Sequence, residues 1–324
     1  MLNTVCVLGG TGFIGTWLVN ELNDRGCRII VPTRDREHAR TLWMLPRVEL
    51  VSADVHDPAT LARLFTGVDV VFNLVGILNE AGDDGEGFRY AHQELSRKVI
   101  EAARQQGVHR LLHMSALNAD PDAPSHYLKT KGIAENRVLN ADEPNLRTAV
   151  FRPSVVFGPG DGMFCRFDKM LGLTPGVMLL PCADARFAPV YVGDVVAAML
   201  HALDDPKLKA TRYELCGSDE MTLLDMVHLI NQVRGRRRLI LPLGPGLSAP
   251  LARLLEFLPG QPMSRDNFRS TQVASVCNPD SKGVVRLADL GITPQRVIDV
   301  LPEILGMPRQ QRRFTRARQH ARRA

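Results

Sequence analysis

The first half of the chain alternates short apolar runs with longer amphipathic segments. Six runs are almost continuously apolar, at residues 4–8, 28–33, 48–52, 69–75, 110–115 and 147–153. Segments with a helical period separate them, the clearest being residues 87–107. Continuous apolar strands separated by helices are typical of a parallel sheet that is covered on both faces. We therefore expect an α/β fold with a doubly wound parallel sheet.

The pattern changes after about residue 157, where proline and glycine interrupt shorter apolar segments. We predict a main domain over residues 1–157 and a smaller C-terminal lobe over residues 158–308. Residues 187–205 have the pattern of a strand followed by a helix, and we expect them to pack back on the main sheet. Residues 309–324 are expected to form a basic, disordered tail.

A glycine-rich loop follows the first predicted strand directly. The segment VLGGTGFIG places Gly9, Gly12 and Gly15 in a GxxGxxG spacing, immediately before a predicted helix. In dinucleotide-binding folds these glycines permit a tight turn, backbone approach to the pyrophosphate, and close packing of helix on strand. The helix N-terminus then attracts the anion. This context predicts a Rossmann-type NAD(P)-binding site, and the other loop residues expected to line it are Thr11, Phe13 and Ile14.

The end of the second predicted strand bears on the choice between NAD and NADP. An NAD site commonly has an acid there to bind the ribose 2′-hydroxyl, but Thr33 occupies that place and Arg34 follows it. Because an arginine suits the 2′-phosphate, NADP(H) is favoured over NAD(H). Asp35 keeps the alternative open, since a shift of one residue would make it the acid. The remaining interpretation is that Arg34 and Asp35 are ordinary solvated side chains with no role in cofactor binding.

Two further strand ends are expected to line the same cofactor. Asp54 and Val55 follow the third predicted strand, where they would lie beside the adenine ring. Asn73, Leu74 and Val75 end the fourth strand, where the backbone would line the cofactor. Taken alone, Asn73 is more typical of an amide that stabilises a turn.

The segment SHYLKTKGIAEN places Tyr127 four residues before Lys131, so that the two side chains share one face of a predicted helix. A neighbouring ammonium stabilises a phenolate, which would lower the tyrosine pKa from its usual value of about 10. Tyr127 could then exchange a proton with a substrate hydroxyl or carbonyl. Lys131 is also expected to hold the nicotinamide ribose, and Ser115, at the end of the fifth predicted strand, to orient the substrate. No metal site is predicted.

Length and composition indicate an ordinary globular protein. The chain has 324 residues, of which 45% are hydrophobic and 23% charged, which is enough for a large core. Six scattered cysteines without a CxxC pair predict buried thiols in a reducing compartment rather than a disulfide framework. The uncharged residues 1–20 contain spaced glycines and lack the basic start of a signal peptide. No run is suited to spanning a bilayer, so we expect a cytoplasmic protein.

The net charge of +5 comes from the C-terminal end. Residues 309–324 hold seven arginines and no acid, and subtracting these seven leaves −2 for the rest of the chain. Nucleic-acid binding is therefore unlikely for the body of the protein. The tail is expected to be solvated, or to dock on an anionic membrane surface or on an acidic partner. The apolar stretch 239–260 could also line a pocket or touch a membrane, although lobe core is the simpler interpretation.

Several of these motifs together resemble the short-chain dehydrogenase/reductase superfamily: the glycine loop, Asp54-Val55, Asn73, Ser115 and Tyr127-xxx-Lys131. The segments RPSVVFGPGDG (152–162) and FAPVYVGDVV (187–196) resemble its extended or atypical branch, which is similar to NAD-dependent epimerases and dehydratases. Within it, the chain resembles the group of the nucleotide-binding accessory subunit of respiratory complex I and its bacterial relatives. The resemblance implies a Rossmann fold, a bound NAD(P)(H) and a triad of Ser115, Tyr127 and Lys131.

Two classes of function stay open at this point. The first is an oxidoreductase, in which Tyr127 and Lys131 serve proton transfer and a hydride passes to or from the nicotinamide, with a small, lipophilic or quinone-like substrate. The second is a non-catalytic accessory or assembly subunit of a membrane respiratory complex. A sugar-nucleotide epimerase or dehydratase is a further alternative. Epimerases usually carry an asparagine and a tyrosine where this chain has Ser154 or Val155 and Phe157.

Overall fold

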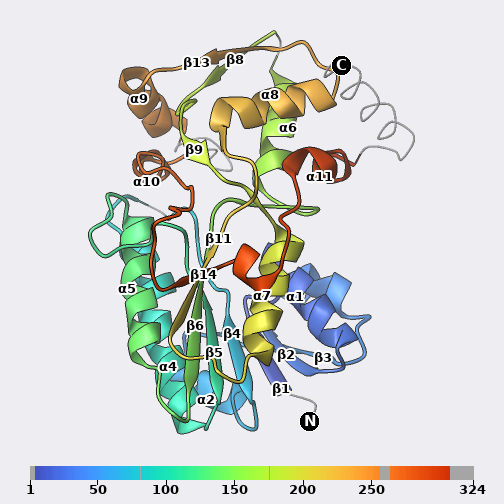
Figure 1. Ribbon diagram of the computed structural model, residues 1–324, viewed down its shortest axis with the longest axis vertical. Helices are drawn as coiled ribbons and strands as arrows, with labels where there is room; N and C mark the ends of the chain where they lie inside the picture. The colour runs from blue at the N-terminus through green and yellow to red at the C-terminus, as the bar shows by residue number, and fades with distance from the viewer. Residues whose placement is uncertain (1–3, 81, 175, 256–262, 307–324) are drawn as a thin grey trace. The chain divides into compact units, whose positions relative to one another are not determined.

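The computed structural model describes residues 4–80, 82–174, 176–255 and 263–306 (Figure 1). The tail predicted at residues 309–324 therefore lies outside the described residues. The chain forms two compact units. Unit 1 contains residues 1–154, 192–215 and 277–293, and unit 2 contains residues 155–191, 216–276 and 294–324.

Unit 1 is built on an eight-stranded sheet in the order β14-β11-β6-β5-β4-β1-β2-β3, in which all neighbours run parallel. The strands are β1 (Thr4–Leu8), β2 (Arg28–Thr33), β3 (Val48–Ser52), β4 (Val70–Asn73), β5 (Arg110–Met114), β6 (Arg147–Pro153), β11 (Thr211–Leu215) and β14 (Val284–Arg286). The order 3-2-1-4-5-6 is that of the doubly wound dinucleotide-binding fold. The predicted fold class is confirmed, and β1 to β6 coincide with the six apolar runs.

Strands β11 and β14 extend this sheet beyond β6, and the apolar pattern does not predict them. Strand β14 has three residues, which is too short for a periodic signal. Strand β11 carries Arg212 and Glu214, whose side chains take part in the polar network described below. Both strands are therefore specified by partners that lie far away in the sequence.

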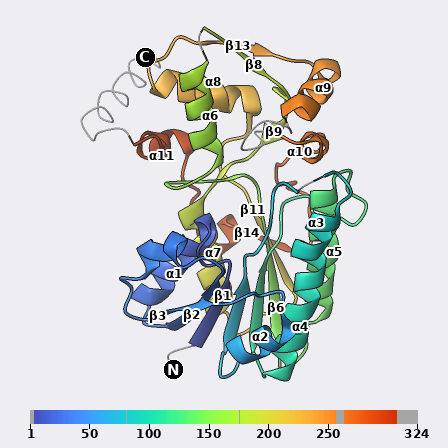
Figure 2. The ribbon, with the colours of Figure 1, turned by 180° about the vertical axis from the view of Figure 1, so that it is seen from behind.

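Helices cover both faces of the sheet, as the front and back views show (Figures 1 and 2). On one face α1 (Phe13–Asp24) contacts α7 (Val192–Asp204), which also contacts β6. On the other face lie α2 (Pro58–Leu64), α4 (Leu95–Gln105) and α5 (His126–Asn140). Leu61, Val99 and Val138 from these three helices pack with Val71 and Leu111 of the sheet to form a buried core.

The predicted helix 87–107 forms with a local irregularity. It comprises α3 (Glu86–Phe88), a π-helical turn (Arg89–Glu94) and α4. Such wide turns are rare and frequently lie at functional sites, because they turn side chains out of the regular helical register. The turn contains His92, which is buried. Two 3₁₀ turns complete unit 1, Glu37–Leu42 and Ala288–Leu290.

Unit 2 combines short strand pairs with helices. The parallel pairs are β7 (Val156–Phe157) with β10 (Val190–Tyr191) and β8 (Val177–Leu180) with β13 (Leu239–Pro242), and the antiparallel pair is β9 (Arg186–Phe187) with β12 (Met221–Thr222). The helices are α6 (Met163–Leu173), α8 (Leu223–Val233), α9 (Pro245–Leu255), α10 (Arg265–Ser270) and α11 (Val297–Ile304). Helix α8 begins with a capping box of Thr222 and Asp225.

A separate hydrophobic core holds unit 2 together. Phe164 and Leu171 of α6 pack with Val227 of α8, Leu301 of α11 and Met178 of β8. These side chains are nearly or fully buried. In the described part of the chain, no helix is both long and apolar enough to cross a membrane.

The cysteines differ in part from expectation. Cys6 and Cys27 are buried free thiols, and Cys165 and Cys182 are partly exposed free thiols. Cys216 and Cys277 are disulfide-bonded, so the expectation of thiols alone is wrong for these two. Their separation in sequence gave no signal, because disulfide formation depends on a spatial proximity that spacing alone does not reveal.

Candidate cofactor and catalytic site

The glycine loop after β1 requires its small residues for steric reasons. Gly9 has a left-handed backbone with φ of +78°, which glycine adopts without strain. A Cβ atom on Gly15 would lie 2.2 Å from the carbonyl oxygen of Gly9, so only glycine lets the helix start so close to the turn. The N–H of Gly12 donates to that same carbonyl oxygen at 3.0 Å. The first glycine therefore permits the tight turn, and the third permits the close approach of the helix to the loop.

The N-terminus of α1 is suited to an anion. The N-cap residue Gly12 is exposed and provides no side-chain cap. Phe13 and Ile14 lie in the first turn, where N–H groups have no intrahelical partner, and this turn contains no acidic residue. Free N–H groups and the helix dipole attract phosphate at such a position. Together with the half-buried Thr11, these residues fit the pyrophosphate of a dinucleotide.

Arg34 and Asp35, which follow β2, differ in their contacts. The hydroxyl of Thr33 donates to the Asp35 carbonyl oxygen at 2.9 Å, and the Asp35 carboxylate accepts the N–H of Glu37 at 2.9 Å. Asp35 therefore stabilises the turn that follows β2. Arg34 is exposed and has no hydrogen bond or ion pair to any described residue. Burial is the main cause that lowers the pKa of His56, and the charges of Lys98 and then Arg34 act in the same direction, against Asp54.

The loop after β3 contains an aromatic and cationic cluster. The Asp54 carboxylate accepts the N–H of His56 at 2.9 Å, and Val55 packs against the core. The His56 ring stacks on Tyr90 with centroids 3.9 Å apart. The Lys98 ammonium donates to the His56 carbonyl oxygen at 2.8 Å and lies 5.7 Å from the Tyr90 ring centre. Sequence reasoning missed this cluster, whose members come from three separate segments.

The end of β4 closes the glycine loop from the other side. The amide oxygen of the buried Asn73 accepts the N–H of Val75 at 3.3 Å, the turn-stabilising contact that its residue type favours. The N–H of Leu74 donates to the Leu8 carbonyl oxygen at 2.9 Å. A Cβ atom on Gly9 would lie 3.1 Å from the Leu74 carbonyl carbon. The backbone of Leu74 and Val75 therefore lies directly against the glycine loop.

Helix α5 presents Tyr127 and Lys131 on one face. The helix begins after Ser125, whose hydroxyl accepts the N–H of Leu128 at 3.1 Å. The Tyr127 ring packs edge-on against His92, with centroids 5.7 Å apart, and against Phe88 at 6.1 Å. These contacts fix the plane of the phenol ring and leave few alternative rotamers.

The Lys131 ammonium is buried between the ends of β4 and β5. The side chain is 3% exposed, and Nζ donates to the Met114 carbonyl oxygen at 3.0 Å. A Cβ atom on Gly76 would lie 2.9 Å from Nζ, so the absence of a side chain at Gly76 leaves room for the ammonium. Burial lowers the pKa of Lys131 to about 8.

The pKa of Tyr127 moves opposite to the direction expected from the Tyr-xxx-Lys spacing. Burial raises this pKa to about 12, and the lysine does not offset that rise. The reason is geometric: the Lys131 ammonium is directed to the Met114 carbonyl oxygen at the end of β5. Tyr127 is therefore a protonated phenol at neutral pH.

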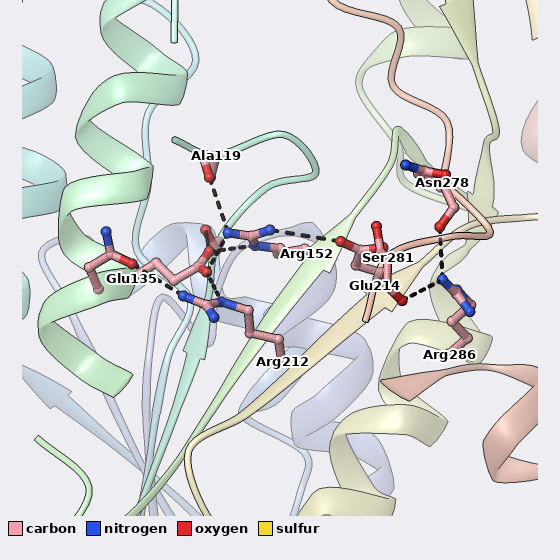
Figure 3. A network of polar contacts seen from close by, with 10 residues as sticks. Ala119, Glu135, Arg152, Arg212, Glu214, Asn278, Ser281 and Arg286 are labelled. Atoms are coloured by element: carbon pink, nitrogen blue, oxygen red, sulfur yellow. Dashed lines mark hydrogen bonds and ion pairs between the residues drawn. The ribbon is translucent and has the colours of Figure 1, made fainter. Parts of the chain in front are cut away.

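A polar network is centred on Glu135 (Figure 3), and the hydroxyl of Ser115 belongs to it. Ser115 Oγ donates to Glu135 Oε2 at 2.8 Å, and the Glu135 side chain is fully buried. Arg152 Nε donates to Oε2 at 2.8 Å, and Arg212 Nε donates to Oε1 at 2.7 Å. Arg152 also donates to the Ala119 carbonyl oxygen at 3.1 Å. The network joins the end of β5 to α5, β6 and β11.

Two buried histidines beside Lys131 were missed by sequence reasoning. His92 Nε2 accepts the N–H of Ile77 at 3.2 Å, so Nδ1 carries the proton and donates to Thr130 Oγ1 at 2.9 Å. Burial, and then Lys131, lower the pKa of His92 well below its ordinary value. The ring nitrogens of His113 have no partner among the described residues, and burial lowers its pKa to about 3. Both rings are neutral, so they add no charge around the ammonium.

The sheet order, the glycine loop and the open helix N-terminus define a dinucleotide-binding protein of the Rossmann class. The chain belongs to the NAD dependent epimerase/dehydratase family, whose model matches residues 5–216. This confirms the resemblance that the sequence motifs carry. The family and the loop geometry together support binding of NAD(H).

Relatives of this chain include respiratory subunits and a reductase. The chain is 27% identical to the mitochondrial NADH-ubiquinone oxidoreductase 40 kDa subunit of Neurospora crassa, over 90% of this chain and 76% of that protein. It is 30% identical to ceramide reductase of Caulobacter vibrioides, over 75% of this chain and 74% of that enzyme. The solved structure of Pal from Bacillus thuringiensis superposes with a TM-score of 0.75 at 18% identity, covering 94% and 99% of the two chains. That likeness concerns the fold.

Proposed function

We propose that this protein is an NAD(P)H-dependent reductase of the short-chain dehydrogenase/reductase type, with Tyr127 as proton donor and Lys131 as the cation beside it. The observation that carries the proposal is the Tyr127 ring, held edge-on by Phe88 and His92 on the helix face that it shares with the buried ammonium of Lys131. A lysine has three donors, and Lys131 uses one of them, to the Met114 carbonyl oxygen, in the described residues. A buried cation with unused donors costs stability and is suited to holding the hydroxyls of a cofactor ribose.

The protonation state of Tyr127 favours reduction over oxidation. Reduction of a carbonyl needs a proton for the oxygen that becomes a hydroxyl, and oxidation needs a phenolate that accepts one. With its pKa raised to about 12 by burial, Tyr127 holds its proton at neutral pH. When bound, NAD(P)H supplies the hydride for the carbonyl carbon. Tyr127 gives its proton to the carbonyl oxygen and regains one from solvent, so the reaction yields an alcohol.

NADPH is the favoured cofactor because of the two side chains after β2. Arg34 is exposed and has no hydrogen bond or ion pair to any described residue, so its guanidinium is available for a ligand. Asp35 holds the N–H of Glu37 with its carboxylate, which opposes a role as ribose ligand. An arginine in this position suits a 2′-phosphate.

The proposed substrate is a small lipophilic ketone or quinone. A relative named ceramide reductase supports a lipophilic carbonyl compound as the class. The protein would act in the cytoplasm or peripherally at the inner membrane face, where such substrates partition. A sugar-nucleotide epimerase activity is the less favoured reaction, because Ser154 or Val155, and Phe157, stand where epimerases usually carry an asparagine and a tyrosine.

A nucleotide-binding accessory subunit of a respiratory complex is the second candidate. The relationship to the Neurospora subunit supports it, and so does the position of the Ser115 hydroxyl. This hydroxyl donates to Glu135 inside the arginine network, which opposes its proposed role in orienting a substrate. In that case the dinucleotide would have a structural role.

A pair of variants separates the two candidates. Gly12→Val obstructs the loop, since even a Cβ atom there would lie 3.2 Å from the Gly9 carbonyl oxygen, and it should abolish nucleotide binding under both. Tyr127→Phe removes the proton donor alone. In a reductase it should lower kcat by about 10² to 10⁴ while NADPH still binds. Purified protein titrated with NADPH and NADH should show micromolar binding with rapid exchange. Nucleotide that co-purifies and stays bound, with function intact in Tyr127→Phe, supports the accessory role instead.

A further inference from the structure

Unit 2 carries an apolar surface on one face of its β8–β13 pair. We define the aliphatic face as Val177, Leu179, Leu239 and Leu241. These residues are direct cross-strand partners, Val177 with Leu239 and Leu179 with Leu241. Val177 is 43% exposed and its partner Leu239 is 56% exposed. Leu179 is 53% exposed and its partner Leu241 is 41% exposed. The alternate residues Met178, Leu180 and Ile240 are buried in the core of unit 2.

Apolar residues on both faces are unusual for a strand pair at a surface. Half-exposed strands normally alternate apolar with polar positions, and parallel sheets are nearly always covered on both faces. Ten large hydrophobic residues are exposed in the described chain; six of them fall within residues 173–247, and four of these six are neighbours on this one strand pair. The two outside the aliphatic face are Leu173, which ends α6, and Leu247 of α9. The face is therefore built to be covered.

The segments that carry this face are rich in arginine and poor in acids. Residues 226–255 contain five arginines and no aspartate or glutamate. The one acid of residues 162–183 is Asp168, whose carboxylate is bound by Arg234 and Arg236. Although burial acts against it, these two guanidiniums lower the pKa of Asp168. Arg237 and Arg238, immediately before β13, have no ion pair to any described residue. Arg237 and Arg238 are therefore cationic groups next to the face in sequence, while acids lie directly beyond the two segments, at Asp161, Asp184, Asp225 and Glu256.

We propose that the aliphatic face docks on an anionic lipid bilayer, with Arg237 and Arg238 at the lipid phosphates. Peripheral membrane contacts combine apolar side chains at the acyl boundary with basic residues at the headgroups. Protein interfaces instead concentrate their binding energy in tryptophan, tyrosine and arginine, with leucine and valine under-represented. The aliphatic face has no aromatic residue. Its composition and the adjacent Arg237 and Arg238 therefore favour lipid, independently of the reaction proposed for unit 1.

Vesicle binding by the full-length protein tests this proposal. Wild type is mixed with phosphatidylcholine vesicles that contain or lack phosphatidylglycerol, and the bound fraction is measured by flotation. Each half-exposed leucine should contribute about a fivefold factor, so Leu179→Ser with Leu241→Ser should lower partition at least about tenfold. Arg237→Gln with Arg238→Gln should lower binding to the anionic vesicles about tenfold and leave the zwitterionic baseline unchanged. Trp43→Ser with Met44→Ser, exposed residues of unit 1, is the matched control and should bind like wild type.

A depth measurement separates this face from the basic tail, which all variants retain. Leu179→Trp adds a tryptophan whose fluorescence should be quenched by brominated lipids if the face enters the bilayer. Unchanged unfolding temperatures show that each serine variant is folded. If the leucine variants bind as tightly as wild type and the new tryptophan is not quenched, the proposal is overturned in favour of the tail alone. A wild-type dimer that the leucine variants dissociate, without vesicle binding, overturns it in favour of a second copy.

Discussion

We predict that replacing Lys131 makes the protein more stable, because its ammonium is buried. The pKa of Lys131 falls from its ordinary value of 10.5 to about 8 through burial. That difference corresponds to about 3 kcal/mol of unfavourable free energy for the charged form, at about 1.4 kcal/mol per pH unit. Lys131→Met removes the charge and retains most of the side-chain volume.

The variant also loses one hydrogen bond. The Met114 carbonyl oxygen would lose the ammonium donor now 3.0 Å away, at a cost of about 2 kcal/mol. At pH 7 the variant should therefore be more stable than wild type by about 1 kcal/mol, the remainder of these two terms. A functional group that costs stability in this way is typical of a binding or catalytic site.

The pH dependence gives a sharper test than the stability at one pH. Between about pH 8 and 10.5 the unfolded chain binds more protons at this lysine than the folded chain, so wild-type stability rises with pH in this window. Relative to the variant, wild type should gain about 2 kcal/mol between pH 7 and pH 9.5. The stability difference should then reverse sign, leaving wild type the more stable protein at pH 9.5.

Urea unfolding followed by tryptophan fluorescence measures this difference in unit 1. Both tryptophans of the chain, Trp17 and Trp43, lie in unit 1, so the signal reports on the unit that contains Lys131. Lys129→Met on the same helix is the matched control, because its side chain is exposed and its replacement should change stability by less than about 0.5 kcal/mol. A difference between wild type and Lys131→Met that is the same at both pH values would refute the reasoning.

Three other variants test the network, the loop and the cofactor choice. Glu135→Gln should destabilise unit 1 by about 2–4 kcal/mol in the same urea assay, and toward the lower end of this range because its partner Arg212 is 37% exposed. The control is Glu101→Gln, which breaks an exposed ion pair and should cost less than about 1 kcal/mol. Gly15→Ala should abolish NADH binding in a fluorescence titration, because its Cβ would lie 2.2 Å from the Gly9 carbonyl oxygen; wild-type affinity would contradict the loop geometry. Arg34→Asn should raise the Kd for NADPH about tenfold and leave that for NADH within about twofold, and equal effects on both would contradict a 2′-phosphate role.

The fold was predictable where local sequence decides it. Strands β1 to β6 are continuous apolar runs, and their alternation with helices indicates the doubly wound class to which the observed order belongs. Strand β11 escaped prediction because Arg212 and Glu214 interrupt its apolar character, and these residues are accommodated by Glu135 and Arg152 from distant segments. Burial of a charge by a partner far away in the sequence leaves no periodic signal.

The candidate site was likewise predictable where local sequence decides it, and not where distant residues do. Helical spacing places Tyr127 and Lys131 on one face, and a strand–loop–helix context identifies the glycine loop. The direction of the Ser115 hydroxyl, by contrast, depends on Glu135, which lies one turn beyond Lys131 on α5 and is held by two arginines. The position of His92 depends on a π-helical turn that no residue pattern announces. Sequence therefore indicates which residues share an element, and tertiary contacts decide where each polar group points.

Lys131 and Tyr127 bear differently on the two proposed functions. A buried ammonium with unused donors would bind a permanently retained nucleotide as well as a nucleotide that is exchanged in each turnover. Lys131 is therefore expected in an enzyme and in an accessory subunit alike. The Tyr127 ring is held edge-on by Phe88 and His92, and its proton is retained up to about pH 12. In the proposed reductase this proton passes to the carbonyl oxygen, whereas retention of a nucleotide involves no proton transfer. The loss caused by Tyr127→Phe, compared with that caused by Lys131→Met, therefore measures how much of the site serves chemistry rather than retention of the cofactor.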